Sequence, residues 1–135
     1  MTRPRTIPPV RDYMSTSPLS IAAERTMSQA HAIMTRAQIR HLPVMAADKL
    51  VGIITLGDLH MISAIGNVDP THVRVDTVMT PEVYVVAPDA PIDEVVTEMA
   101  RQKYGSAIVV DRGEVVGVFT VVDVCRALAE TLRQG

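Results

Sequence analysis

The chain contains an internal repeat, because the sequence aligns with itself without a gap when it is shifted by 65 residues. Identical residues keep one register along the whole repeat: Met14 with Met79, Met34 with Met99, Arg36 with Arg101, Val44 with Val109, Val51 with Val116, Gly52 with Gly117, Thr55 with Thr120 and Asp58 with Asp123. Such a repeat indicates that one supersecondary unit is built twice. A unit of about 60 residues is only marginally stable alone. We therefore expect the two copies to pack together.

Hydrophobic periodicity predicts the same order of elements in both copies, a strand, a helix, two strands and a closing helix. For the first copy we expect a strand at 20–21, a helix at 27–37, strands at 42–45 and 50–55, and a helix at 56–65. For the second copy we expect a strand at 83–86, a helix that starts at Pro91 and ends at Gly105, strands at 107–110 and 115–119 around a hairpin turn, and a helix at 121–132.

These patterns predict an α/β (α+β) fold of tandem β-α-β-β-α repeats. We expect the repeats to pack sheet to sheet with pseudo-two-fold symmetry, which would create two equivalent clefts between them. The expected domain organisation is a flexible tail at 1–9, a first repeat at 10–66, a linker at 67–74 and a second repeat at 75–135, all within one module.

Composition excludes several classes of function. A net charge of −2, with 13 basic and 15 acidic residues, leaves no basic surface for a nucleic-acid backbone. No apolar run approaches the roughly 20 residues that span a bilayer. Residues 1–9 lack the apolar segment of a secretory signal. Cys125 is the single cysteine, which excludes an internal disulfide and favours a reducing, cytoplasmic location.

Three sets of residues together resemble a known family. The segment 52–58 has the pattern Gly-x-x-Thr-x-x-Asp and recurs at 117–123, the lead-in segments 10–15 and 75–81 both contain Met followed by Ser or Thr, and 40–44 reads Arg-His-Leu-Pro-Val. In these features the chain resembles a cystathionine-β-synthase (CBS) domain pair. The resemblance covers about 10–132, nearly the whole chain.

The resemblance implies a stand-alone regulatory module that senses cellular energy by binding an adenosine nucleotide. AMP, ADP, ATP or S-adenosylmethionine would lie in clefts between the repeats, with no cofactor required. The Asp of the repeated motif would hold the ribose hydroxyls, and the Thr would lie near the ribose or phosphate. Each cleft would also use residues from the other repeat. The family further implies a homodimer and a regulated partner protein that the sequence does not identify.

The resemblance also implies which residues would form each cleft. The first cleft is predicted to contain Thr120, Asp123, Arg40, His41, Pro43, Ser15 and Ser20. The second is predicted to contain Thr55, Asp58, Thr80, Tyr84 and Ser106. Because an Arg side chain suits phosphate, we expect the Asp123 cleft to prefer phosphorylated ligands and the Asp58 cleft to bind more weakly. A solvent-exposed cation at a helix end is the alternative role for Arg40.

A purely structural role for the repeated motif remains open. Thr followed three residues later by an acidic residue is also a capping box, which stabilises a helix start without any ligand. The alternative function is therefore a ligand-free dimerisation or scaffolding module. The apolar closing helices at 56–65 and 121–132 favour a homodimer in either case.

Catalytic and metal-binding functions find little support. His31, His41, His60 and His72 lack metal-ligand spacing, and no nucleophile elbow or phosphate-binding loop is present. Cys125 lies on the apolar stripe of the last helix and is expected to be a core residue, and the same periodicity places Met27, Met34 and Met99 in the core. Tyr84 is expected to be an exposed strand residue unless it stacks on an adenine. We therefore expect no enzymatic activity.

Overall fold

The computed structural model describes residues 6–16 and 19–134, which form two compact units. The first-repeat unit is Leu19–Val83, and the second-repeat unit joins the segment before residue 19 to the chain from Tyr84 onward. Each unit has its own three-stranded sheet and two α-helices, so the predicted α+β repeat is confirmed. In the described part of the chain, no helix is long and apolar enough to cross a membrane.

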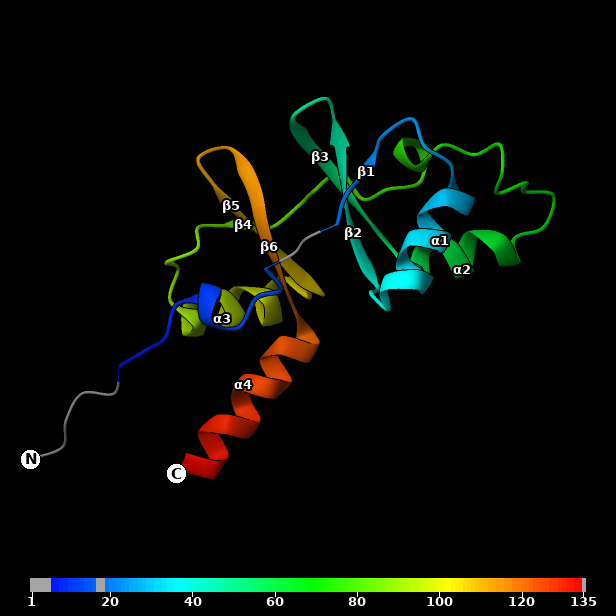
Figure 1. The fold of residues 1–135 in the computed structure, drawn as a ribbon. Helices are drawn as coiled ribbons and strands as arrows, with labels where there is room; N and C mark the ends of the chain where they lie inside the picture. Colours follow the sequence, from blue (N-terminus) through cyan, green and yellow to red (C-terminus); the bar gives the residue numbers. More distant parts are fainter. Residues whose placement is uncertain (1–5, 17–18, 135) are drawn as a thin grey trace, which may run out of the picture. The chain divides into compact units, whose positions relative to one another are not determined.

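In the first-repeat unit, two helices lie beside each other next to the sheet (Figure 1). Its elements are β1 (Ile21–Ala22), α1 (Met27–Ala37), β2 (His41–Ala46), β3 (Lys49–Thr55), α2 (Leu56–Ala64) and a 3-10 turn at Val75–Thr77. β2 pairs with β1 in parallel and with β3 antiparallel. The core is aliphatic and includes the fully buried Met27, Met34 and Leu42. The periodicity of 27–37 thus predicted both the helix and the face that it buries.

The second-repeat unit repeats this order. Its elements are a 3-10 turn at Val10–Asp12, β4 (Val85–Val86), α3 (Ile92–Gln102), β5 (Ser106–Asp111), β6 (Glu114–Thr120) and α4 (Val121–Gln134). β5 pairs with β4 in parallel and with β6 antiparallel, and the predicted hairpin closes between Asp111 and Glu114. Its core contains Val10, Val95, Met99 and Phe119.

The predicted end of α3 at Gly105 is wrong. The helix ends at Gln102, and Lys103 takes the left-handed conformation with φ 62°. The Lys103 N–H then donates to the Met99 carbonyl, as does the N–H of Tyr104. A residue other than glycine supplies the cap here, at the modest energetic cost of a left-handed backbone.

The prediction that Cys125 is a core residue is also wrong, because its side chain is exposed. No described residue of α4 is buried, and Val124 only partly covers the core of its unit. α4 extends away from the sheet beyond the end of β6 (Figure 1). The apolar stripe identifies the face of the helix that avoids water, but not whether the unit itself covers that face.

The two lead-in segments are exchanged between the repeats. Ser15, which precedes the first repeat in the chain, pairs with Val118 of the second through N–H to carbonyl bonds of 2.9 and 3.2 Å. Thr80 pairs with Ile53 of the first repeat through two bonds of 2.9 Å. Residues 1–5 of the expected tail lie outside the described residues, whereas the Pro8 carbonyl accepts a bond of 3.0 Å from Ile92 N–H.

Glycine permits both of these close backbone approaches. A Cβ atom on Gly117 would lie 2.8 Å from the Ser15 carbonyl oxygen and would also collide with the Met14 sulfur. A Cβ atom on Gly52 would meet Thr80 and Met79 in the same way. The first residue of the repeated Gly-x-x-Thr-x-x-Asp pattern is therefore required by packing.

We expect Gly117→Ala to lower the free energy of unfolding by about 1–3 kcal/mol, because backbone must move to admit the methyl group. Gly57→Ala is the matched control, since the nearest atom to its Cβ is Thr55 Oγ1 at 3.8 Å. That control should be neutral or stabilising by up to about 1 kcal/mol, because alanine is the better helix former. Urea unfolding measures both effects, and a Gly117→Ala variant as stable as the wild type would contradict the packing argument.

Candidate functional site

The first-repeat motif forms a complete capping box at the start of α2. Thr55 Oγ1 accepts a hydrogen bond of 3.1 Å from Asp58 N–H, and Asp58 Oδ2 accepts one of 3.2 Å from Thr55 N–H. Among the described residues, Asp58 Oδ1 has no hydrogen-bond donor. The cap therefore leaves most of the acceptor capacity of this carboxylate unused.

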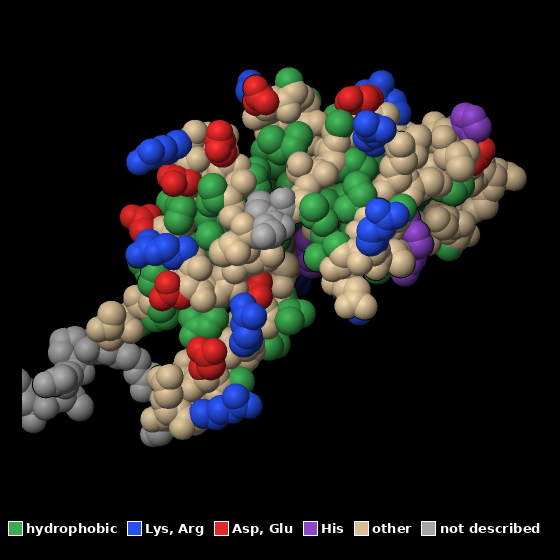
Figure 2. Space-filling model, in the orientation of Figure 1, with side chains coloured by type: hydrophobic (Ala, Val, Ile, Leu, Met, Phe, Trp, Pro, Cys, Tyr) green, Lys and Arg blue, Asp and Glu red, His purple; other side chains and the backbone are tan. Residues whose placement is uncertain are grey.

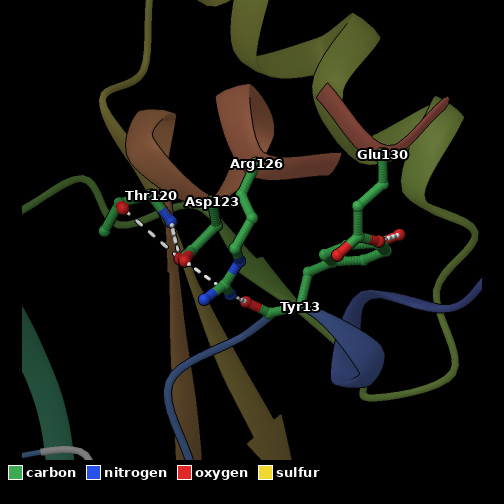
Figure 3. A network of polar contacts seen from close by, with 5 residues as sticks. All are labelled: Tyr13, Thr120, Asp123, Arg126 and Glu130. Atoms are coloured by element: carbon green, nitrogen blue, oxygen red, sulfur yellow. Dashed lines mark hydrogen bonds and ion pairs between the residues drawn. The ribbon is translucent and has the colours of Figure 1, made fainter. Parts of the chain in front are cut away.

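The second-repeat motif is engaged more extensively at the start of α4 (Figure 3). Asp123 Oδ2 accepts a bond of 2.9 Å from Thr120 N–H and a longer one of 3.3 Å from the Thr120 hydroxyl. Asp123 Oδ1 accepts a bond of 3.1 Å from Arg126 Nη2. Three of the roughly four lone-pair positions of this carboxylate are thus occupied.

Arg126 also connects this carboxylate to the first lead-in segment. Its Nη2 donates a bond of 2.7 Å to the Tyr13 carbonyl, and the Tyr13 hydroxyl donates one of 2.6 Å to Glu130 (Figure 3). The hydrogen bond to Glu130 raises the pKa of Tyr13 above its ordinary value. The network therefore links α4 to a segment more than a hundred residues earlier in the chain.

Sequence reasoning missed Tyr13, Arg126 and Glu130, although the repeat contained a signal for them. At a shift of 65 residues their counterparts are Val78, Met61 and Ile65, which all lie in the first-repeat unit. Polar residues thus stand in the second-repeat unit at three positions where the first-repeat unit is apolar. Where matched residues of the two units differ in polarity at several neighbouring positions, the difference indicates a polar contact that only one unit has.

Five of the predicted site residues lie in the first-repeat unit with Thr55 and Asp58. His41 stands opposite Thr55 in the sheet, and the Arg40 carbonyl accepts a bond of 2.9 Å from Leu56 N–H. Thr80 pairs with Ile53 beside the same strand end. Pro43 is buried within β2, so it contributes packing, and Ser20 is exposed before β1.

The other three lie in the second-repeat unit with Thr120 and Asp123. Ser106 is buried and stands opposite Thr120 in the sheet. Ser15 pairs with Val118, which lies two residues before Thr120 on the same strand. Tyr84 is partly buried and stacks on Tyr104 with ring centroids 5.2 Å apart, so it is not an exposed strand residue. The predicted grouping of Asp123 with Arg40 and His41, and of Asp58 with Ser106 and Tyr84, joins residues of different units and stays a prediction.

His41 is a partly buried histidine whose surroundings shift its pKa. Burial lowers the pKa of its imidazole, and the nearby positive charge of Arg40 acts in the same direction, whereas the Asp58 carboxylate partly opposes both. The neutral ring is therefore favoured beside Thr55. In the described part of the chain, no group of three or more His, Cys, Asp or Glu side chains could hold a metal ion.

The lowered pKa of His41 makes folding stability depend on pH. The unfolded chain takes up the proton near its ordinary pKa of about 6.5, whereas the folded chain resists protonation. The contribution is therefore present above that pH and is lost as the pH falls toward the lower folded pKa. We expect the free energy of unfolding to decrease from pH 7.5 to pH 5.5, and to decrease less in His41→Gln. His31→Gln, at an exposed helix position, is the control for loss of a histidine. A slope unchanged by His41→Gln would contradict the assignment.

Comparison with known proteins places this geometry in a family. The family model described as "CBS domain" matches twice, at residues 10–64 and 75–130. L-aspartate semialdehyde sulfurtransferase of Methanocaldococcus jannaschii is 31% identical over 119 residues, which cover 87% of this chain and 22% of that protein. Inosine-5'-monophosphate dehydrogenase of Thermoplasma acidophilum is 31% identical over 116 residues, which cover 85% of this chain and 21% of that protein. The chain thus spans about a fifth of the length of these two relatives.

Solved structures agree with the family match over nearly the full chain. The CBS domain pair of protein MJ0100, solved in complex with 5'-methylthioadenosine and S-adenosyl-L-methionine, has a TM-score of 0.84 and 30% identity, with 93% of this chain and 99% of that chain covered. A putative acetoin utilization protein from Vibrio cholerae has a TM-score of 0.81 and 28% identity, with 95% of each chain covered. The chain therefore belongs to the CBS domain family and consists of a pair of CBS domains.

Proposed function

We propose that this chain is a regulatory module that binds an adenosine-containing ligand, namely AMP, ADP, ATP or S-adenosylmethionine. The Asp58 and Asp123 carboxylates would accept hydrogen bonds from ribose hydroxyls. The observation that supports this most is shared by both strand-to-helix junctions: the Asp carboxylate accepts a bond from the Thr N–H three residues earlier and keeps acceptor capacity beyond the bonds that it makes within the chain. The complex of the similar MJ0100 domain pair with two adenosine compounds agrees with this ligand class.

The chemistry of the helix start suits a nucleotide. An ionised carboxylate only accepts hydrogen bonds, which matches the two donors of a ribose diol. The first N–H groups of a helix and its dipole favour a negative charge such as a phosphate. Both features occur together at the start of α2 and of α4, which are nine and 14 residues long. One ligand could thus satisfy the carboxylate and the helix start at once.

A ligand-free scaffolding role is the second candidate, and two observations favour it. Both Asp side chains bond the backbone of their own helix start, as a purely structural cap requires. In addition, the apolar side chains of α4 are exposed in the single chain, among them Leu128 at 56% and Leu132 at 72%. A second copy of the chain that covers this face would give the module a structural use without a ligand.

Asp→Asn substitutions separate these two roles. Asn keeps an oxygen that can accept the cap bond but removes the charge and one acceptor, so we expect Asp123→Asn and Asp58→Asn each to weaken AMP binding by about tenfold or more at its own site. The larger loss of AMP affinity should come from Asp123→Asn. Isothermal titration calorimetry with AMP measures both affinities.

Thr26→Ala is the matched control for capping, because Thr26 and Gln29 form a capping box at the start of α1 that belongs to neither motif. It should cost about 1 kcal/mol of stability and leave AMP binding unchanged. Absence of binding by AMP, ATP and S-adenosylmethionine to the wild-type chain would refute the ligand role. A larger loss of AMP affinity from Asp58→Asn than from Asp123→Asn would refute the proposed order of the two sites.

We also propose that the exposed apolar face of α4 pairs with a second copy of the chain. Leu128→Glu combined with Leu132→Glu should then shift the sedimentation coefficient from that of a dimer to that of a monomer, because charges would be buried in the contact. Arg133→Glu also places a carboxylate on this helix, but about 100° around the axis from Leu132, and should leave the dimer intact. A monomeric wild-type chain would contradict this pairing.

A further inference from the structure

The Asp123 carboxylate already has an internal partner where a ligand is proposed to bind. Arg126 Nη2 donates to Asp123 Oδ1 at 3.1 Å, while both Thr120 bonds go to Oδ2. Two ribose hydroxyls need two acceptor positions, and this carboxylate has about one left. Binding of a diol therefore requires the guanidinium to give up its contact with Oδ1.

Asp58 shows what the same motif looks like without this partner. The residue that matches Arg126 is Met61, whose side chain carries no charge and is 66% exposed. Only the Thr55 N–H bonds the Asp58 carboxylate among the described residues. Asp58 can thus accept both hydroxyls of a ribose without breaking any bond, so the two copies differ in this one step.

Arg126 would stay close to a bound ligand after it leaves Asp123. Its Nη2 is also held by the Tyr13 carbonyl at 2.7 Å, and Nη2 is the only nitrogen of this guanidinium that donates within the described residues. Nε and Nη1 are therefore open donors on a side chain that is 57% exposed. Figure 2 shows basic and acidic side chains alternating along the visible face of α4, with hydrophobic side chains at its margin. A guanidinium with two open donors is well suited to a phosphate.

We infer that Arg126 makes the Asp123 site discriminate between neutral adenosine nucleosides and their phosphorylated forms, an inference that rests on the proposed function. A neutral nucleoside must displace the guanidinium from Oδ1 and offers it no new partner. A nucleotide displaces it in the same way but supplies a phosphate for the released donors. The first-repeat motif, with Met61 at the matched position, lacks this discrimination.

Calorimetric titration with adenosine and with AMP tests the inference. The titrations use an Asp58→Asn background, so that the Asp123 site dominates binding. With Arg126 present, AMP should bind more tightly than adenosine. Arg126→Met, which copies the residue of the other repeat, should tighten adenosine binding about two- to fivefold, the range for loss of a partly exposed ion pair. The same variant should weaken AMP binding about tenfold, because a charge-assisted contact to phosphate is lost.

Two controls accompany Arg126→Met. Arg101→Met removes another arginine of the same unit that pairs with an acid three residues away, Glu98, and should change neither affinity. Arg126→Lys keeps the positive charge and should retain most of the preference for AMP, which separates the effect of charge from any disturbance of the fold.

The failure of this inference differs from the failure of the proposed function. If Arg126→Met leaves the ratio of the AMP and adenosine affinities unchanged, the inference is overturned while ligand binding stands. The inference is also overturned, and ligand binding stands, in a second case. In that case the Asp58→Asn chains bind neither AMP nor adenosine, with or without Arg126, whereas the chain with Asp58 intact binds adenosine. If no variant and no wild-type chain binds either compound, both are overturned.

Discussion

Two backbone crossings, at Gly52 and Gly117, hold the lead-in segments against the sheets. Each crossing needs a residue without a side chain, because the carbonyl of Ser15 or Thr80 lies where a Cβ atom would be. The paired N–H and carbonyl groups of Ser15 with Val118 and of Thr80 with Ile53 depend on this approach. Since each segment pairs with the repeat that it does not precede, neither repeat is completed by its own stretch of sequence. Because of this exchange, the second-repeat unit is assembled from two separate stretches of the chain.

The same crossings place residues of the lead-in segments beside the helix starts. Gly117 and Val118 lie on β6 shortly before Thr120. The lead-in segment that pairs with Val118 through Ser15 therefore passes close to the Asp123 motif. In the second repeat this brings Tyr13 within reach of Arg126, and through it of the carboxylate. The first repeat has apolar residues at the matching positions, and its carboxylate stays more open. Duplication therefore produced two similar helix starts with different electrostatic surroundings.

Patterns that depend on neighbours in the chain were predictable from the residues, whereas pairings between distant segments were predictable only where the family resemblance implied them. The helix at 27–37 and the four long strands follow from local periodicity, and the structure agrees with them to within one or two residues. The exchange of the lead-in segments has no local signal, because both segments read alike. The grouping of Ser15 with Asp123 and of Thr80 with Asp58 came from the family resemblance, and the backbone pairs of Ser15 and Thr80 agree with it. The exposure of Cys125 depends on what covers α4, which a stripe on a helix cannot specify. The contact between Tyr13 and Arg126 could be suspected only from the positions where the repeats disagree.

The central claim is that the Asp58 and Asp123 carboxylates each bind the two hydroxyls of a ribose. The most direct test removes those hydroxyls from the ligand. Adenosine and 2',3'-dideoxyadenosine differ only in the two hydroxyls that Asp58 and Asp123 are proposed to bind. Their dissociation constants with the unmodified chain should differ by about tenfold or more, with adenosine the tighter ligand, because each lost hydroxyl removes a charge-assisted hydrogen bond. Equal dissociation constants would contradict the account and leave both Thr-x-x-Asp motifs as helix caps.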